Sequence, residues 1–189
     1  PGSGGKDSFF VSHILKTKYN MNPLTVTWAP LIYTDIGWKN FQKWMQVGFD
    51  NLLFTPDRKV QSLLVKHAFL NLLNPFQPFI QGQRTIGAKF AKKYSVKLVM
   101  YGENQAEAHN KIEEASTPLM HHKHFTIKSA DKNKIYLSGM NLNNLKEIGI
   151  KEKDLNPYIP LEENEFLDLG IETHYMSYYL NWSPQSNFY

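Results

Sequence analysis

The amino-acid sequence predicts an α/β fold, in which a mostly parallel sheet lies between two layers of helices. Short apolar segments rich in β-branched and aromatic residues alternate along the chain with longer segments whose apolar residues recur at helical spacing. Strands that alternate with helices in this way are joined by right-handed crossovers. Sheets of this kind bind ligands at the carboxyl ends of their strands.

The composition suits one domain with a substantial core. The chain has 189 residues, of which 42% are hydrophobic and 14% are aromatic. We expect a single domain over residues 1–189, with a less regular region at 105–175 that forms an insertion or faces the substrate. The absence of cysteine excludes a disulfide, a thiolate metal site and a cysteine nucleophile within this sequence.

Charge and hydropathy restrict the partners. The net charge of +4 is small and evenly spread, so it does not by itself argue for nucleic acid. No apolar run approaches the roughly 20 residues of a membrane span, and no signal peptide pattern is present. We therefore expect a cytoplasmic protein without a membrane span or a nucleic-acid partner.

The first eight residues, PGSGGKDS, have the composition of a loop that holds phosphate. Gly2, Gly4 and Gly5 can adopt positive φ angles that turn successive backbone N–H groups toward an anion, and they let a ligand approach the backbone. The loop is not a Walker A motif, because Lys6 is followed by Asp7 and the leading glycine is missing. A Rossmann G-x-G-x-x-G pattern is also absent.

This loop runs directly into an amphipathic helix. Apolar residues over 9–15 predict the helix, and Ser8 or Asp7 would cap it. The N–H groups and the dipole at its N-terminus favour an anion, for which a pyrophosphate group is suitable. A plain glycine-rich turn or a purification-tag remnant is the alternative, but an added linker would not continue unbroken into K-D-S and this helix.

The pattern S-G-G-x-D-S resembles the PP-loop of the ATP pyrophosphatase superfamily. These enzymes break ATP between the α and β phosphates and adenylate a substrate. The resemblance implies a Rossmann-like three-layer α/β/α sandwich of the adenine nucleotide alpha hydrolase type, with ATP and Mg²⁺ as cofactors. Because a phosphate loop of this kind normally follows a strand, and residues 183–189 read as the start of a helix, we expect a chain truncated at both ends.

Apolar patterns and proline stops predict the remaining elements. In chain order we expect a strand at 24–29, a helix at 37–47, a strand at 51–55, a long helix from Asp57 to a break at 74–78, a helix at 84–94 and a strand at 97–101. The second half is less regular. There we expect a polar loop region at 105–134, a short strand at 134–137, short helices at 142–148 and 151–155, an acidic segment at 162–172 and a last strand at 175–180.

Three loop regions should converge if the sheet is parallel, because the carboxyl ends of parallel strands meet at one edge. The residues concerned are Ser3, Gly4, Gly5, Lys6, Asp7 and Ser8 in the first loop, Thr27 and Trp28 after the first strand, and Gly102, Glu103 and Asn104 after the third. In the PP-loop architecture the second of these regions lines the adenine and ribose, and the third closes the phosphate side.

The resemblance also implies catalytic roles, for which the candidates are Lys6, Asp7, Glu103 and Asn104. Asp7 or Glu103 could hold Mg²⁺, which prefers one or two carboxylates together with phosphate oxygens. Lys6 would offset the charge that develops on the leaving pyrophosphate. For Glu103 and Asn104, an ordinary polar exit from a strand is the plainer alternative.

Five further segments make the resemblance narrower. They are MNPLTVTWAP (21–30), IYTDIGWKNF (32–41), NPFQPFIQGQ (74–83), YGEN (101–104) and LNWSP (180–184). Together they look like the N-acetyl sugar amidotransferase family of bacterial lipopolysaccharide and surface-polysaccharide biosynthesis. The similarity covers residues 2–102 almost without a gap and resumes near Tyr175, whereas the family's cysteine-rich N-terminal segment is absent.

The family resemblance implies that the protein converts the acetamido group of a nucleotide-linked N-acetyl sugar into an acetamidino group. The amide oxygen would attack the α-phosphate of ATP, and ammonia would then displace AMP. Glutaminases that supply ammonia are usually cysteine enzymes, and this sequence has no cysteine. We therefore expect a separate glutaminase subunit, similar to the glutaminase and cyclase pair of histidine biosynthesis.

Four weaker candidates have plainer alternatives. Asp35 is expected to cap a helix or to touch the sugar or ribose. Gln83 and Arg84 would open a helix, where Arg84 could bind a phosphate or form a surface salt bridge. The HHKH segment at 121–124 could bind a transition metal, but histidines in a polar loop are more often solvated.

Two other functions remain open at this point. A tRNA-modifying PP-loop enzyme would adenylate a base, but it should show a cysteine pair or a strongly basic face, and the sequence shows neither. A non-catalytic nucleotide-binding module would keep the fold without the chemistry. The intact S-G-G-K-D-S loop favours an active enzyme over such a module.

Overall fold

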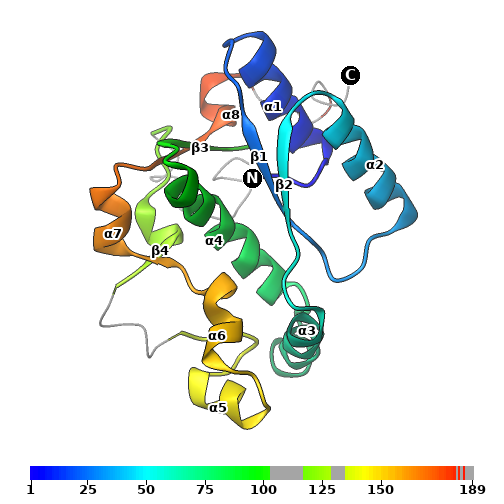
Figure 1. The fold of residues 1–189 in the computed structure, drawn as a ribbon, viewed down its shortest axis with the longest axis vertical. Helices are drawn as coiled ribbons and strands as arrows, with labels where there is room; N and C mark the ends of the chain where they lie inside the picture. Colours follow the sequence, from blue (N-terminus) through cyan, green and yellow to red (C-terminus); the bar gives the residue numbers. More distant parts are fainter. Residues whose placement is uncertain (103–116, 129–134, 182, 184, 186–189) are drawn as a thin grey trace.

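The computed structural model describes residues 1–102, 117–128, 135–181, 183 and 185. Within these residues the protein is a mixed α/β structure, in which short parallel strands are interleaved with helices (Figure 1). The first half contains α1 (Lys6–Thr17), β1 (Leu24–Trp28), α2 (Asp35–Gln46), β2 (Asp50–Phe54), α3 (Arg58–Leu72), α4 (Gln77–Tyr94) and β3 (Leu98–Tyr101).

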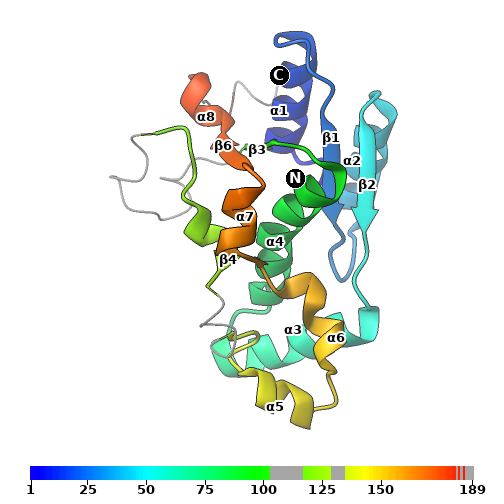
Figure 2. The ribbon, with the colours of Figure 1, turned by 60° about the vertical axis from the view of Figure 1, so that its left-hand side comes forward.

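The second half contains shorter elements. They are η2 (His122–His124), β4 (Thr126–Ile127), α5 (Leu142–Glu147), α6 (Glu152–Leu155), η4 (Asn156–Tyr158), β5 (Leu161–Glu162), α7 (Glu163–Asp168), β6 (Glu172–Tyr175) and α8 (Met176–Tyr179). In both views α3, α5 and α6 lie at one end of the molecule, and α1 and α8 lie at the other (Figures 1 and 2). None of the helices in the described ranges is both long enough and apolar enough to cross a membrane.

The described strands form three parallel pairs. β1 pairs with β2 from Leu24 opposite Asp50 to Trp28 opposite Phe54. β3 pairs in the same way with β6, and β4 with β5. The predicted alternation of helices with parallel strands is therefore confirmed, while the strands described here are divided among three two-stranded sheets.

Side-chain caps explain where several helices begin. Asp57 accepts hydrogen bonds from the backbone N–H groups of Lys59 and Val60 and so begins α3, as predicted. The cap of α2 is Thr34, whose side chain accepts from the N–H of Gly37, so the prediction that Asp35 is the cap was wrong by one residue. Asp35 is instead the first residue of the helix, where its negative charge interacts favourably with the helix dipole.

The helix α4 begins earlier than predicted. It starts at Gln77 with Pro78 in its first turn, where proline is tolerated because the first N–H groups of a helix have no intrahelical partner. The break therefore ends at Phe76, and Gln83 and Arg84 lie in the middle of the helix and do not open it. Proline fits the first turn of a helix as well as a break between helices, so Pro78 does not end the helical segment.

The last strand was also misplaced. The prediction put it at 175–180, but β6 ends at Tyr175 and the helix α8 follows it. Met176 is buried in this short helix, and a short apolar and aromatic run suits a buried helix as well as a strand. The expected strand at 134–137 is represented in the described residues only by a bridge between Leu137 and Met140.

The longest helix, α4, packs against both β1 and β3. It approaches β1 at Gly82, where an added Cβ atom would lie 2.2 Å from Cε2 of the Trp28 indole. Any side chain at this position would clash with the ring, so only glycine fits there. The largest cluster of buried apolar residues surrounds this contact and includes Val26, Leu64 and Ile86.

Candidate phosphate-binding site

The glycine loop before α1 is fixed to the first strand. Gly2 donates its backbone N–H to the carbonyl oxygen of Val26 in β1 at 2.9 Å. Gly4 has a φ of +80°, and a Cβ atom there would lie 3.0 Å from the carbonyl oxygen of Asn40. The expectation of positive φ angles holds for Gly4 but not for Gly5, which has a φ of −70°, nor for Gly2.

The N-cap residue of α1 has no side chain that could accept a hydrogen bond from the first turn. The helix begins at Lys6, and its N-cap residue is Gly5, so the prediction that Ser8 or Asp7 caps it was wrong. Ser8 lies inside the first turn, where its hydroxyl donates to the carbonyl oxygen of Gly5 at 3.0 Å and accepts from the N–H of Ser3 at 3.4 Å. The first N–H groups of a helix have no intrahelical acceptor, and together with the dipole they favour an anion.

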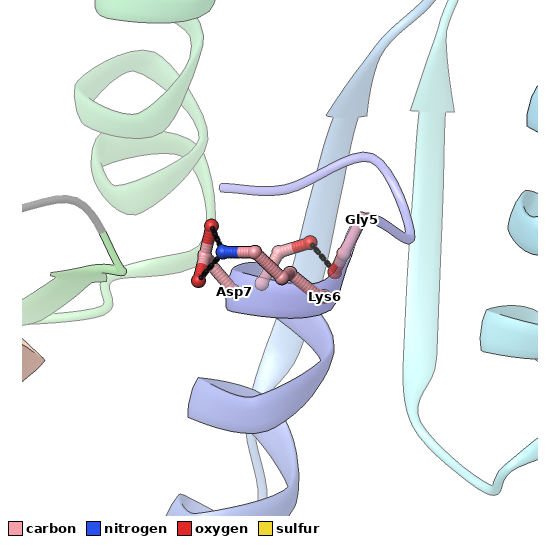
Figure 3. A network of polar contacts seen from close by, with 4 residues as sticks. Gly5, Lys6 and Asp7 are labelled. Atoms are coloured by element: carbon pink, nitrogen blue, oxygen red, sulfur yellow. Dashed lines mark hydrogen bonds and ion pairs between the residues drawn. The ribbon is translucent and has the colours of Figure 1, made fainter. Parts of the chain in front are cut away.

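Lys6 and Asp7 form an ion pair on this first turn. The Nζ atom of Lys6 lies 2.7 Å from both carboxylate oxygens of Asp7. Figure 3 shows this pair on the first turn of the helix. The two side chains are 40% and 34% exposed. An exposed pair of this kind contributes about 0–1 kcal/mol, so a bound ion could replace either partner at small cost.

The end of β3 lies against the same turn. A Cβ atom on Gly102 would be 3.3 Å from the Cβ atom and the backbone of Asp7. The structure therefore brings together two of the three predicted loop regions, the N-terminal loop and the residue that follows β3. Glu103 and Asn104 lie outside the described residues.

Thr27 and Trp28, at the end of β1, are core residues. Thr27 is completely buried, and the Trp28 ring packs against Phe54 and Tyr158 with centroid distances of 5.1 Å in each case. The indole is also covered by Gly82. Contact between a ligand and this end of the strand would therefore use the backbone and not the indole face.

Two buried polar atoms at this strand end lack partners. Among the described residues, no hydrogen bond is made by Thr27 Oγ1 or by Trp28 Nε1. Buried polar atoms usually have a hydrogen-bond partner, because leaving them without one costs free energy of folding. These two atoms are therefore unusual for a protein core.

The remaining candidates lie elsewhere. Asp35 and Arg84 are exposed, and neither takes part in an ion pair within the described part of the chain. The carbonyl oxygen of Gln83 accepts a hydrogen bond from the Tyr101 hydroxyl at 3.4 Å. This bond links the middle of α4 with the last residue of β3.

The histidines at 121–124 stabilise a local turn. His122 Nε2 lies 2.7 Å from Glu163 Oε1, and the ring of His121 accepts the N–H of Lys123. No group of three potential metal ligands occurs among the residues that the structure describes.

A partly buried lysine and a cavity were not predicted from the sequence. Burial lowers the pKa of Lys89, on α4, to about 8, and its ammonium group donates to the carbonyl oxygen of Asn156. The cavity has a volume of about 260 Å³ and lies between α1, α4, β1 and β3. No local sequence signal marks either feature, because both depend on segments that are distant in the chain.

No model of a protein family matches the chain, and no curated protein matches it either. The assignment of function therefore depends on the geometry of the loop and on the sequence motif.

Proposed function

We propose that the glycine loop at residues 2–5 and the first turn of α1 bind the phosphate groups of ATP. One observation supports this most directly. A glycine loop held to β1 by the bond from Gly2 to Val26 presents the first turn of a 12-residue helix whose N-cap residue is a glycine, and Lys6 lies on that turn. Backbone N–H groups that have no intrahelical acceptor, a helix dipole and an ammonium group at one place are the components of an anion site.

The roles follow from position. The backbone of Ser3, Gly4 and Gly5 would surround the phosphate groups, and Lys6 would neutralise charge on the leaving pyrophosphate. Asp7 would hold Mg²⁺, since a single carboxylate together with phosphate oxygens matches the preference of this ion. Both roles require the ion pair between Lys6 and Asp7 to open. Because the pair is exposed, breaking it costs little free energy.

On this basis, and on the resemblance of the S-G-G-K-D-S motif, the protein is an ATP pyrophosphatase-type amidotransferase. The acetamido oxygen of a nucleotide-linked N-acetyl sugar attacks the α-phosphate, and pyrophosphate leaves. Ammonia then adds to the carbon of the O-adenylyl imidate, and AMP leaves with the oxygen, giving the acetamidino sugar. A separate glutaminase supplies the ammonia, because the chain contains no cysteine.

The corresponding fold is a Rossmann-like three-layer sandwich of the PP-loop type with one mostly parallel sheet. The parallel pairing of all three strand pairs supports this arrangement. The packing of α4 against both β1 and β3 supports it too, because a helix that covers two neighbouring parts of one sheet contacts both.

The proposal is tested by calorimetric titration of the 189-residue chain with ATP and with pyrophosphate in the presence of Mg²⁺. Lys6→Ala should weaken both affinities about tenfold, the size expected when one charge-assisted contact is lost. Lys153→Ala is the matched control, since Lys153 is an exposed lysine on α6, at the other end of the molecule (Figure 2). Equal binding by the wild type and by Lys6→Ala would contradict the proposal.

Product analysis separates the alternatives. Release of AMP and pyrophosphate that depends on an N-acetyl sugar nucleotide supports the amidotransferase. The same release that depends on tRNA supports the modification enzyme, and binding without any turnover indicates a nucleotide-binding module.

A further inference from the structure

The connection between α3 and α4 carries a group of exposed apolar side chains, which we call the apolar tip. Its members are Phe69, Leu70, Leu72, Leu73, Phe76 and Ile80. Together they expose on the order of 600 Å², the upper end of the range for the largest apolar patch on a monomeric protein. Exposed apolar surface of this extent marks contact with another surface.

The core does not require these side chains. Leu64 and Ala68 of α3 and Ile86 of α4 are buried and fill the inner faces of the two helices. The apolar tip occupies outer positions, where an ordinary amphipathic helix carries polar residues. Both helices are therefore apolar on two faces at the end where they are connected.

Leu73 is the clearest case. It is 81% exposed, and as the C-cap residue of α3 it has a φ of +53°. Glycine or asparagine usually occupies a left-handed position at the end of a helix, because a Cβ atom is disfavoured there. The stability of the fold alone therefore does not explain a leucine at this position.

Every charged side chain in the segment 58–102 is a cation. The segment holds eight of the 21 Lys and Arg residues and no Asp or Glu, which leaves 13 cations for the 17 acidic residues elsewhere. The net charge of +4 is therefore not evenly spread, contrary to our expectation. Residues 142–155, which include α5 and α6 at the same end of the molecule, carry three lysines and three acidic residues and add no net charge (Figure 2).

Two of these cations adjoin the apolar tip. Lys66 precedes Phe69 and Leu70 by three and four positions, and Arg84 follows Ile80 by four, spacings at which side chains are neighbours on the surface of a helix. Lys66 and Arg84 are exposed, and neither forms an ion pair with a residue that the structure describes. On each helix the apolar surface is thus followed, about one turn away, by a cation.

We propose that the apolar tip docks on the surface of an anionic lipid bilayer. Its apolar side chains enter the boundary between the headgroups and the acyl chains, and Lys66 and Arg84 contact the lipid phosphates. Exposed Phe and Leu side chains beside Lys and Arg are the composition of a segment that binds at this interface. The inference concerns a surface distant from the glycine loop and does not depend on ATP binding.

Charge and shape favour this occupant over two others. A second copy of the chain would bring Lys66 and Arg84 of both copies together, and the segment 58–102 has no carboxylate to offset them. A nucleic acid would neutralise the cations, but aliphatic side chains such as Leu70 and Leu73 do not stack on bases and would stay in water. An anionic bilayer satisfies the cations and the apolar side chains at once.

The test is sedimentation of the 189-residue chain with large unilamellar vesicles. Vesicles of phosphatidylcholine alone are compared with vesicles that contain about 30% phosphatidylserine, which gives an anionic surface. We expect the partition coefficient to be at least about tenfold larger on the anionic vesicles and to fall as salt is added. Equal partitioning on both kinds of vesicle, or no binding to either, would overturn the inference.

Leu73→Gly separates docking from folding. It relieves the left-handed strain, so the melting temperature should stay the same or rise, while the partition coefficient should fall about tenfold because an inserted leucine is lost. Ile32→Gly is the matched control, since it removes a similarly exposed apolar side chain before α2 and should leave partitioning unchanged. Equal partitioning of the two variants would contradict a specific docking surface.

The cations are tested in the same assay. Lys66→Gln should weaken binding to the anionic vesicles about fivefold, the loss expected for one cation at an anionic surface, whereas Lys43→Gln, at an exposed position of α2, should have no effect. Sedimentation velocity provides the last check. A dimer that Leu73→Gly dissociates, without binding of the wild type to vesicles, would overturn the inference, because a second copy would then be the occupant.

Discussion

Gly2 donates its backbone N–H to the carbonyl oxygen of Val26 at 2.9 Å, and this bond holds the glycine loop against the first strand. Val26 is the middle residue of β1, and Gly102, which follows β3, lies against Asp7 on the helical turn after the loop. The turn therefore lies near the carboxyl end of β3, at the edge where the parallel strands of α/β proteins receive ligands. Substitutions in the loop should affect anion binding more than they affect the core.

Gly4→Ala should reduce ATP affinity about tenfold and lower the free energy of unfolding by about 1–2 kcal/mol, because a Cβ atom is strained at a φ of +80°. Gly149→Ala is the control, since Gly149 has a similar φ of +88° and no heavy atom within 4 Å of an added Cβ atom. Calorimetric titration and urea denaturation of both variants measure the two effects. Loss of affinity in Gly149→Ala would show that the effect is not specific to the loop.

Asp7→Asn should leave stability within about 1 kcal/mol of the wild type, because the ion pair with Lys6 is exposed. It should nevertheless weaken the binding of ATP in the presence of Mg²⁺ while leaving magnesium-free pyrophosphate binding unchanged or stronger. Titrations with and without the metal distinguish these outcomes. A parallel loss under both conditions would exclude a metal-binding role for Asp7.

Gly82→Ala should destabilise the fold by about 3 kcal/mol or prevent folding, because the new methyl group would lie 2.2 Å from the buried Trp28 ring. Gly170→Ala controls for the substitution itself, since an added Cβ atom there has nothing within 4 Å and only the φ of +59° opposes it. Its cost should be about 1 kcal/mol. Urea denaturation followed by tryptophan fluorescence gives both values, and equal costs would disprove the close packing.

Lys89 should make stability depend on pH. Burial lowers the pKa of this lysine to about 8 in the folded protein, below its ordinary value of 10.5. Between these two values the unfolded chain binds more protons than the folded chain, so the free energy of unfolding should rise as the pH increases from about 8 to about 10.5. Lys89→Met should lose this increase, whereas Lys93→Met, at an exposed position of the same helix, should keep it.

Ammonium should support amidination by this chain, and glutamine alone should not. The chain has no cysteine with which to hydrolyse glutamine, so only free ammonia or a separate glutaminase can provide the nitrogen. The assay compares acetamidino-sugar formation with glutamine, with ammonium at raised pH, and with glutamine plus a purified glutaminase. Product from glutamine without a partner would contradict the two-subunit hypothesis.

The first half of the fold could be predicted from local signals. Pro30 and Pro56 follow β1 and β2, and Asp57 caps α3, so those boundaries are encoded within a few residues of where they occur. The pair β4 and β5 was not predicted, because each strand has only two residues and a pattern of that length carries no periodicity.

The parts of the candidate site that are contiguous in sequence were predictable, and the contacts between distant segments were not. The glycine loop and its helix are contiguous in sequence, and the approach of Gly102 to Asp7 followed from the rule that parallel strands end at one edge. The contacts that cover the Trp28 indole were not predictable, because Gly82 and Tyr158 come from distant parts of the chain. An indole on a strand looks the same in sequence whether it faces a ligand or the core.

The pairing of Lys6 with Asp7 makes the first turn of α1 electrically balanced before any ligand arrives. A lone phosphate that attracts Lys6 meets the Asp7 carboxylate at close range, and a lone metal ion that attracts Asp7 meets the ammonium group. A metal complex of a phosphate provides a negative group for Lys6 and a positive ion for Asp7 at the same time. Each side chain then exchanges one oppositely charged partner for another. Such a turn would discriminate by the combination of charges, and would favour magnesium nucleotide over either ion alone.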